Sequence, residues 1–139
     1  MTSRFDDIQE LVMRDARKEY SETTMDLFMN PRNHGPMDQA DGLGTVTGPC
    51  GDTMNIWIKV EDGRIVNASF TTDGCGTSIA SASMATVMAK GKTLVQAGRI
   101  EQQDILDALG GLPKESVHCA LLASNTLKAA IKEYAARVR

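Results

Sequence analysis

Two runs of alternating apolar and polar residues, joined by a tight turn, constrain the fold of this chain more than any other feature. The first run has apolar side chains at Met54, Ile56, Ile58 and Val60. The second run, Arg64–Thr72, has them at Val66, Ala68 and Phe70. Asp62-Gly63, between the runs, is a strong signal for a β-hairpin turn. Because successive side chains of a strand point to opposite faces, the pattern predicts two antiparallel strands with one apolar face.

A third strand is expected just before this hairpin. Residues 43–47 form a short run flanked by glycine, which is typical of a brief strand. The three strands would form an antiparallel meander with helices on one face, because the apolar face of a sheet has to be covered. The predicted fold class is therefore α+β, with a three-stranded antiparallel sheet packed against helices.

Helical spacing of apolar residues appears on both sides of the strands. Residues 5–20 predict a short amphipathic helix, and Ser21 is a suitable N-cap for a second one. The apolar residues of that second helix are Met25, Leu27 and Phe28. After the strands, helices are expected at residues 78–89, 93–96, 102–109 and 119–137. The inward face expected for the first of these four is Ile79, Ala82, Ser83, Thr86 and Val87.

Length and composition suit one ordinary globular domain. The chain has 139 residues, 42% of them hydrophobic and 24% charged. A domain of this size can bury a sizeable core without relying on disulfides or a structural metal. We therefore expect a single domain over residues 1–139, with residues 1–19 as a mobile N-terminal segment.

The charge pattern excludes several classes of partner. There are 15 Lys and Arg against 18 Asp and Glu, a net charge of −3, and no clustered basic face of the kind that binds nucleic acid. No stretch approaches the roughly 18 apolar residues of a membrane span. The first residues lack the apolar core of a signal peptide. The sequence thus predicts a cytoplasmic protein that acts without nucleic acid or membrane.

The cysteines are the candidate functional residues. There are three, an odd number, so they cannot all pair within one chain. Cys50 lies in the turn Gly48-Pro49-Cys50-Gly51-Asp52, and Cys75 lies in the turn Asp73-Gly74-Cys75-Gly76. Cys119 follows one of the two histidines, His118. In a reducing compartment, such positions indicate metal or sulfur chemistry rather than disulfides.

Each of these residue types suits a metal–sulfur site. Gly51 permits the tight turn that lets Cys50 and Asp52 approach one ion. Cys75 and Cys119 stand where helices are expected to begin, and a helix N-terminus favours a thiolate. Neutral imidazole and thiolates bind zinc and iron–sulfur clusters. We therefore expect three segments to converge on one exposed site, with Cys50, Asp52, Cys75, His118 and Cys119 as its metal ligands.

Simpler alternatives exist at every one of these positions. A lone cysteine is often a small buried hydrophobe. Asp52 could be a turn residue and His118 a loop residue, and His34, after Asn30-Pro31, is best explained as a loop residue. The sequence contains no Cys-x-x-Cys, so neither a zinc knuckle nor a thioredoxin-type motif is present.

The motifs together resemble the iron–sulfur cluster assembly scaffolds of the IscU type, the family of the NifU N-terminal domain. The matching residues are Tyr20-Ser21, Asn30-Pro31-Arg32-Asn33, Gly48-Pro49-Cys50-Gly51-Asp52, Asp73-Gly74-Cys75-Gly76, Ser78-Ile79-Ala80-Ser81-Ala82-Ser83 and His118-Cys119-Ala120. The resemblance covers the chain from about Tyr20 to its C-terminus. It implies a SufE/NifU-like fold with three strands and helices on one side.

The resemblance also implies a function. Such scaffolds are carriers rather than enzymes: a cysteine desulfurase supplies persulfide sulfur, iron is bound, and a transient [2Fe–2S] cluster is built and passed to apo-proteins. Cys119 would be the persulfide acceptor, and Cys50, Asp52, Cys75 and Cys119 would hold the cluster, with His118 as an alternative ligand. Zinc (Zn²⁺) can occupy the same ligands. Ferredoxin, a frataxin-like protein and an Hsp70-type chaperone are further partners that the resemblance suggests, and the working form is a monomer or a dimer.

One segment departs from the family pattern. The scaffolds carry Leu-Pro-Pro-Val-Lys before His-Cys, where the chaperone binds, but here Leu112-Pro113 is followed by Lys114-Glu115-Ser116. Two other functions compete with the scaffold. One is a zinc-dependent sulfurtransferase resembling SufU, which typically has an insertion before the third cysteine and lacks the adjacent histidine. The other is a structural zinc module, which the expected core makes unnecessary.

Overall fold

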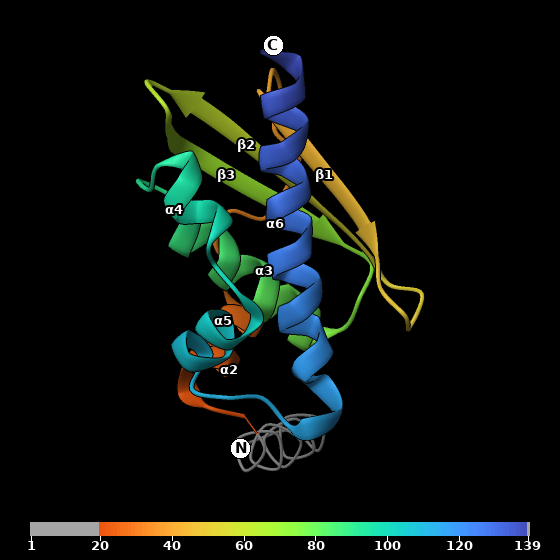
Figure 1. Cartoon of the computed structure of the whole chain (residues 1–139). Coiled ribbons are helices and arrows are strands. Elements are labelled where there is room, and N and C mark those ends of the chain that lie inside the picture. Colours follow the sequence, from red (N-terminus) through yellow and green to blue (C-terminus); the bar gives the residue numbers. More distant parts are fainter. Residues whose placement is uncertain (1–19, 139) are drawn as a thin grey trace, which may run out of the picture.

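The computed structural model describes residues 20–138 (Figure 1). The helix expected over residues 5–20, and the mobile segment expected over residues 1–19, fall outside this range except for Tyr20. In chain order the elements are α2 (Glu22–Met29), β1 (Gly42–Thr47), β2 (Thr53–Glu61), β3 (Arg64–Thr72), α3 (Gly76–Ala89), α4 (Leu94–Gly98), α5 (Gln102–Leu109), a 3₁₀ turn (Lys114–Ser116) and α6 (Val117–Arg137).

The strands form the predicted antiparallel meander, in the order β1-β2-β3. Met54, Ile56 and Ile58 on β2 are fully buried, as their alternation predicts. Helix α6 packs on β1 and β2, and α3 packs on β3 and on α6. Figure 1 shows these two helices on the same side of the sheet. The predicted α+β class, with a three-stranded antiparallel sheet packed against helices, is confirmed.

The predicted alternation fails at the start of β3. Ile65 is buried, whereas Val66 is 42% exposed. Lys59 pairs with Asn67 but Val60 pairs with Ile65, so Val66 is an extra residue on the β3 side. This β-bulge shifts the side-chain phase by one residue, which a strict period of two cannot anticipate.

Backbone groups on both outer edges of the sheet are bonded to other segments. On β3, the backbone of Ile65 exchanges hydrogen bonds with residues 91–92, and the backbone of Phe70 exchanges them with residues 33–35. On β1, the Leu43 N–H donates to the Glu133 carboxylate of α6 at 2.9 Å. Both edge strands are therefore partly covered by the chain itself.

Helix α3 is buried on more sides than its predicted face allows. It contacts β3, α2, α5 and α6, so most of its circumference faces protein. Its buried residues are Thr77, Ser78, Ala80, Ser81, Ala82, Ser83, Ala85, Thr86 and Ala89. Of the predicted inward face, Val87 is 45% exposed and Ile79 is only half-buried. The prediction was wrong there because small residues let neighbours approach from several directions.

The other helices lie near their expected positions. The Ser21 hydroxyl accepts a hydrogen bond from the Thr24 N–H at 3.0 Å, which confirms Ser21 as the N-cap of α2. Helix α5 has the predicted bounds, and α4 is offset by one residue at its start. Helix α6 begins at Val117 rather than at Cys119, so His118 and Cys119 lie within its first turn. No helix within residues 20–138 combines the length and the hydropathy that a membrane crossing requires.

Helix α6 lies directly on β1, with backbone against backbone. A Cβ atom at Gly44 would collide with the carbonyl oxygen of Thr126 and the amide nitrogen of Ala130. Neither atom can move without shifting the helix. Only glycine at position 44 therefore permits this close approach, which fixes the course of α6.

We predict that Gly44→Ala destabilises the protein by about 1–3 kcal/mol, because the added methyl group overpacks a contact between two backbones. The matched control is Gly98→Ala. A Cβ there has nothing within 4 Å, and the change should stay within about 0.5 kcal/mol of the parent. Urea unfolding of the three proteins measures both values. Equal stability of the two variants would contradict the direct packing of α6 on β1.

Candidate functional site

The topology brings the three cysteine segments to one end of the molecule. In the antiparallel meander, β1 ends, β2 begins and β3 ends at the same end of the sheet, as the pairs Thr47–Thr53 and Met54–Thr72 show. Cys50 lies in the β1–β2 turn, and Cys75 is the N-cap residue of α3, just after β3. The first turn of α6 adds His118 and Cys119.

His118 lies between two of the cysteines. Its Nε2 atom is 3.3 Å from the Cys50 sulfur and 3.7 Å from the Cys119 sulfur. Both distances are within hydrogen-bond range for sulfur: Nε2 donates to sulfur in the tautomer that carries its proton and accepts from a thiol S–H in the other tautomer. The β1–β2 turn and the first turn of α6 therefore meet through this ring.

Thr77 connects the other pair. Its hydroxyl oxygen is 3.2 Å from the Cys75 sulfur and 3.3 Å from the Cys119 sulfur, and the Ser78 hydroxyl is 3.5 Å from the Cys119 sulfur. Sequence reasoning did not select these two hydroxyls. The available signal was their place in the first turn of a helix that begins directly after a cysteine.

Asp52 reaches the same region from the start of β2. The turn before it closes with the Gly48 N–H donating to the Asp52 carbonyl at 2.8 Å, and Gly51 has a φ of 88°. A Cβ on Gly74 would lie 2.9 Å from the Asp52 Oδ2 atom and 2.5 Å from the Ser78 hydroxyl. Glycine at position 74 therefore leaves room for a carboxylate beside the Cys75 turn.

The surroundings of Cys75 favour its thiolate. The Thr77 hydroxyl lowers the pKa of Cys75 most, and the backbone N–H groups of Thr77 and Ser78 lower it further. Partial burial and the negative charge of Asp52 act in the opposite direction, but the pKa of Cys75 remains below its ordinary value. The backbone N–H groups at the helix start thus lower the pKa of Cys75 as the sequence predicted, but the larger effect comes from the Thr77 hydroxyl, which the sequence did not predict.

The expectation of one exposed site was wrong for Cys119. Cys50 and Cys75 are exposed, as their glycine-rich turns suggested, but Cys119 is only 2% exposed. The first turn of α6 packs against α3, and this contact covers the Cys119 sulfur with the hydroxyl groups of Thr77 and Ser78.

The five predicted ligands are neighbours without forming a closed coordination shell. Sulfur, imidazole and hydroxyl groups follow one another from Cys50 through His118, Cys119 and Thr77 to Cys75. Within residues 20–138, no three His, Cys, Asp or Glu side chains are arranged to hold one metal ion as they stand.

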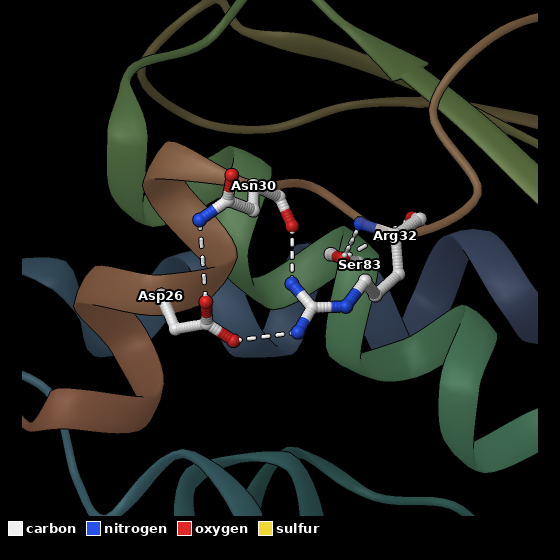
Figure 2. Close-up of polar contacts among 4 residues, drawn as sticks. All are labelled: Asp26, Asn30, Arg32 and Ser83. Carbon is white, nitrogen blue, oxygen red and sulfur yellow. Dashed lines mark hydrogen bonds and ion pairs between the residues drawn. The ribbon is translucent and has the colours of Figure 1, made fainter.

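The segment Asn30-Pro31-Arg32-Asn33 makes contacts of a structural kind (Figure 2). The Arg32 guanidinium pairs with Asp26 at 2.7 Å and donates to the Asn30 carbonyl, so it closes the C-terminal end of α2. The Arg32 N–H donates to the Ser83 hydroxyl at 2.7 Å, which ties the segment to α3. His34 stacks at an angle on Phe70, with 5.2 Å between ring centroids, in keeping with its interpretation as a loop residue.

Comparison with known proteins gives one consistent family. The model of the NifU-like N-terminal domain matches residues 19–139. Iron–sulfur cluster assembly scaffold protein IscU 1 of Archaeoglobus fulgidus is 52% identical over 116 residues, which are 83% of this chain and 76% of that protein. The scaffold protein IscU of Escherichia coli K12 is 47% identical over 120 residues, 83% of this chain and 93% of that protein.

A solved structure supports the fold. The N-terminal part of a nitrogen-fixing NifU-like protein from Brucella abortus superposes with a TM-score of 0.68 at 18% identity, over 88% of this chain and 98% of that one. The extent of the family match and the identity to both relatives lead to one conclusion: the chain belongs to the family of the NifU-like N-terminal domain.

Proposed function

We propose that this protein is an iron–sulfur cluster assembly scaffold, which accepts sulfur, binds iron, builds a transient [2Fe–2S] cluster and transfers it to apo-proteins. The observation that carries the proposal is the meeting of three sequence-distant cysteines through His118 and Thr77 at one end of the fold. Relatives named as scaffold proteins, at 47–52% identity, support it. The protein is a carrier in this proposal, and iron and sulfide are its cargo.

The site residues have different roles in the proposal. Cys50, Asp52, Cys75, His118 and Cys119 are the metal ligands, and Cys119 also accepts the persulfide sulfur. Thiolates bind iron strongly and suit a shared site with sulfide. The lowered pKa of Cys75 makes its thiolate available for this purpose in the free protein. Zinc, which prefers the same thiolate and imidazole ligands, would occupy the site when iron and sulfide are lacking.

Asp52 has a separate role in the proposal. A carboxylate is a harder ligand than a thiolate and exchanges more readily at an iron–sulfur site. Gly74 leaves Asp52 free to lie beside Cys75, where a storage site would have a fourth thiolate. Asp52 therefore keeps the cluster releasable.

Two kinds of partner follow from this chemistry. A cysteine desulfurase supplies the sulfur, and apo iron–sulfur proteins receive the finished cluster. Cys50 and Cys75 are exposed and thus available to such partners.

The first prediction from the proposed function tests that function itself. Anaerobic incubation with ferrous iron, cysteine and a cysteine desulfurase should give the visible absorption of a [2Fe–2S] cluster, which then moves to an apo-ferredoxin. The control is the triple variant Cys50→Ser/Cys75→Ser/Cys119→Ser, which should remain colourless. Persulfide on Cys119 without any cluster would instead indicate a SufU-like, zinc-dependent sulfurtransferase.

The second prediction concerns Asp52. Asp52→Ala should hold its cluster longer than the parent protein and transfer it to apo-ferredoxin several-fold more slowly, because the exchangeable ligand is lost. Transfer is followed by circular dichroism in the visible range. Asp38→Ala, which removes an exposed carboxylate outside the site, is the control and should behave like the parent. If Asp52→Ala transfers as fast as the parent or faster, Asp52 does not promote release.

The third prediction concerns pH. A lowered pKa means that Cys75 loses its proton at a lower pH in the folded protein than in the unfolded chain. The rate of Cys75 alkylation by iodoacetamide should therefore rise at lower pH in native protein than in urea. Mass spectrometry of the Cys75 peptide over a pH series measures both profiles. Coinciding profiles would show that the Thr77 hydroxyl and the backbone N–H groups do not stabilise the Cys75 thiolate.

A further inference from the structure

Thr77 occupies an unusual place between two sulfur atoms. It is 6% exposed, and its hydroxyl oxygen lies 3.2 Å from the Cys75 sulfur and 3.3 Å from the Cys119 sulfur. A hydroxyl group has one proton to donate and two lone pairs that accept. It can therefore donate to one sulfur while it accepts the S–H of the other, so both contacts can exist at once.

The Cys119 sulfur is enclosed by polar groups. Thr77 and Ser78 contact it from α3, and His118 contacts it from its own helix turn. Together with the packing of α6 on α3, they leave Cys119 2% exposed. A sulfur in this position is shielded from any partner in solution, although the proposed function requires Cys119 to accept sulfur from one.

Among these contacts, the one with Thr77 is the shortest: those from Ser78 and His118 measure 3.5 Å and 3.7 Å. The Thr77 hydroxyl also contacts the exposed Cys75, as His118 contacts the exposed Cys50, but Thr77 lies on α3, the helix that covers Cys119. A hydrogen bond inside a protein is stronger than one in water, so a buried hydroxyl holds its partner effectively.

We propose that Thr77 is a positioning residue whose hydroxyl holds the Cys119 sulfur in its buried orientation, so that Cys119 reaches the surface only when this contact opens. Cys50 and Cys75 then meet a partner first, and Cys119 becomes reactive after α3 and the first turn of α6 separate locally. The consequence for sulfur transfer rests on the proposed function, whereas the holding contact does not.

The test is the alkylation of Cys119 in the reduced, metal-free protein. Thr77→Val keeps the shape of the side chain and removes the hydroxyl. It should speed the reaction of Cys119 with iodoacetamide about three- to tenfold, the factor that the loss of one hydrogen bond gives in an opening equilibrium. Thr77→Ser restores a hydroxyl and should return the rate close to that of the parent. Mass spectrometry reads the Cys119 peptide, and the exposed Cys50 serves as an internal reference that should not change.

Thr126→Val is the matched control. It removes another fully buried hydroxyl, one that donates its hydrogen bond to the Leu122 carbonyl within α6. Its Cys119 should react as in the parent. The proposal is overturned if Thr77→Val leaves Cys119 protected, or if Thr77→Ser or Thr126→Val exposes it equally. If the valine variant does not fold, Thr77→Ala is compared with Thr77→Ser: faster alkylation of Cys119 in the alanine variant alone supports the proposal, and equal rates overturn it.

This experiment needs neither iron nor a desulfurase, so its failure is separate from a failure of the proposed function. If the parent protein builds clusters but Thr77→Val leaves Cys119 protected, the scaffold function stands and the proposed role of Thr77 is rejected. If the parent protein builds no cluster but Thr77→Val speeds the alkylation of Cys119, the role of Thr77 stands and the scaffold function is rejected.

Discussion

The direct contact between β1 and α6 is the interaction on which the site depends. Gly44 lets the helix backbone rest on the strand, and this fixes the axis of α6 relative to the sheet. The cysteine turns after β1 and β3 are already fixed by the strand register. The first turn of α6 therefore arrives between them, which puts His118 next to Cys50 and Cys119 next to Thr77. A methyl group at position 44 can thus change where His118 and Cys119 lie relative to the two cysteine turns.

The site combines an exposed cysteine and a buried one. Cys75 stands at the surface with a thiolate favoured by hydroxyl and amide donors, while Cys119 is buried a short distance away under the same hydroxyl. Exposure suits capture and exchange, whereas burial suits protection. One threonine, placed by the first turn of α3, belongs to both environments.

The sequence predicted the parts of the fold that follow from local periodicity. The hairpin around Asp62-Gly63, the Ser21 cap and the bounds of α5 are all set by neighbours in the chain. The bulge at Val66 escaped prediction because it inserts a residue without changing composition. The burial of α3 on several sides escaped it too, because a helix of small residues carries little information about which neighbours it has. In the same way, the glycine turns indicated the exposure of two cysteines, but the burial of Cys119 arises from the packing of α6 on α3, which no local pattern encodes.

The covered edges of the sheet have a consequence for how this protein behaves when it carries nothing. An uncovered edge strand offers unpaired N–H and C=O groups to any other extended chain, and this is a common route to aggregation. Here residues 33–35 and 91–92 occupy the outer side of β3, the bulge at Val66 interrupts its regular ladder, and Glu133 caps the Leu43 N–H on β1. All of these contacts lie within the polypeptide itself, so the sheet is partly protected from self-association whether or not the protein carries a cluster.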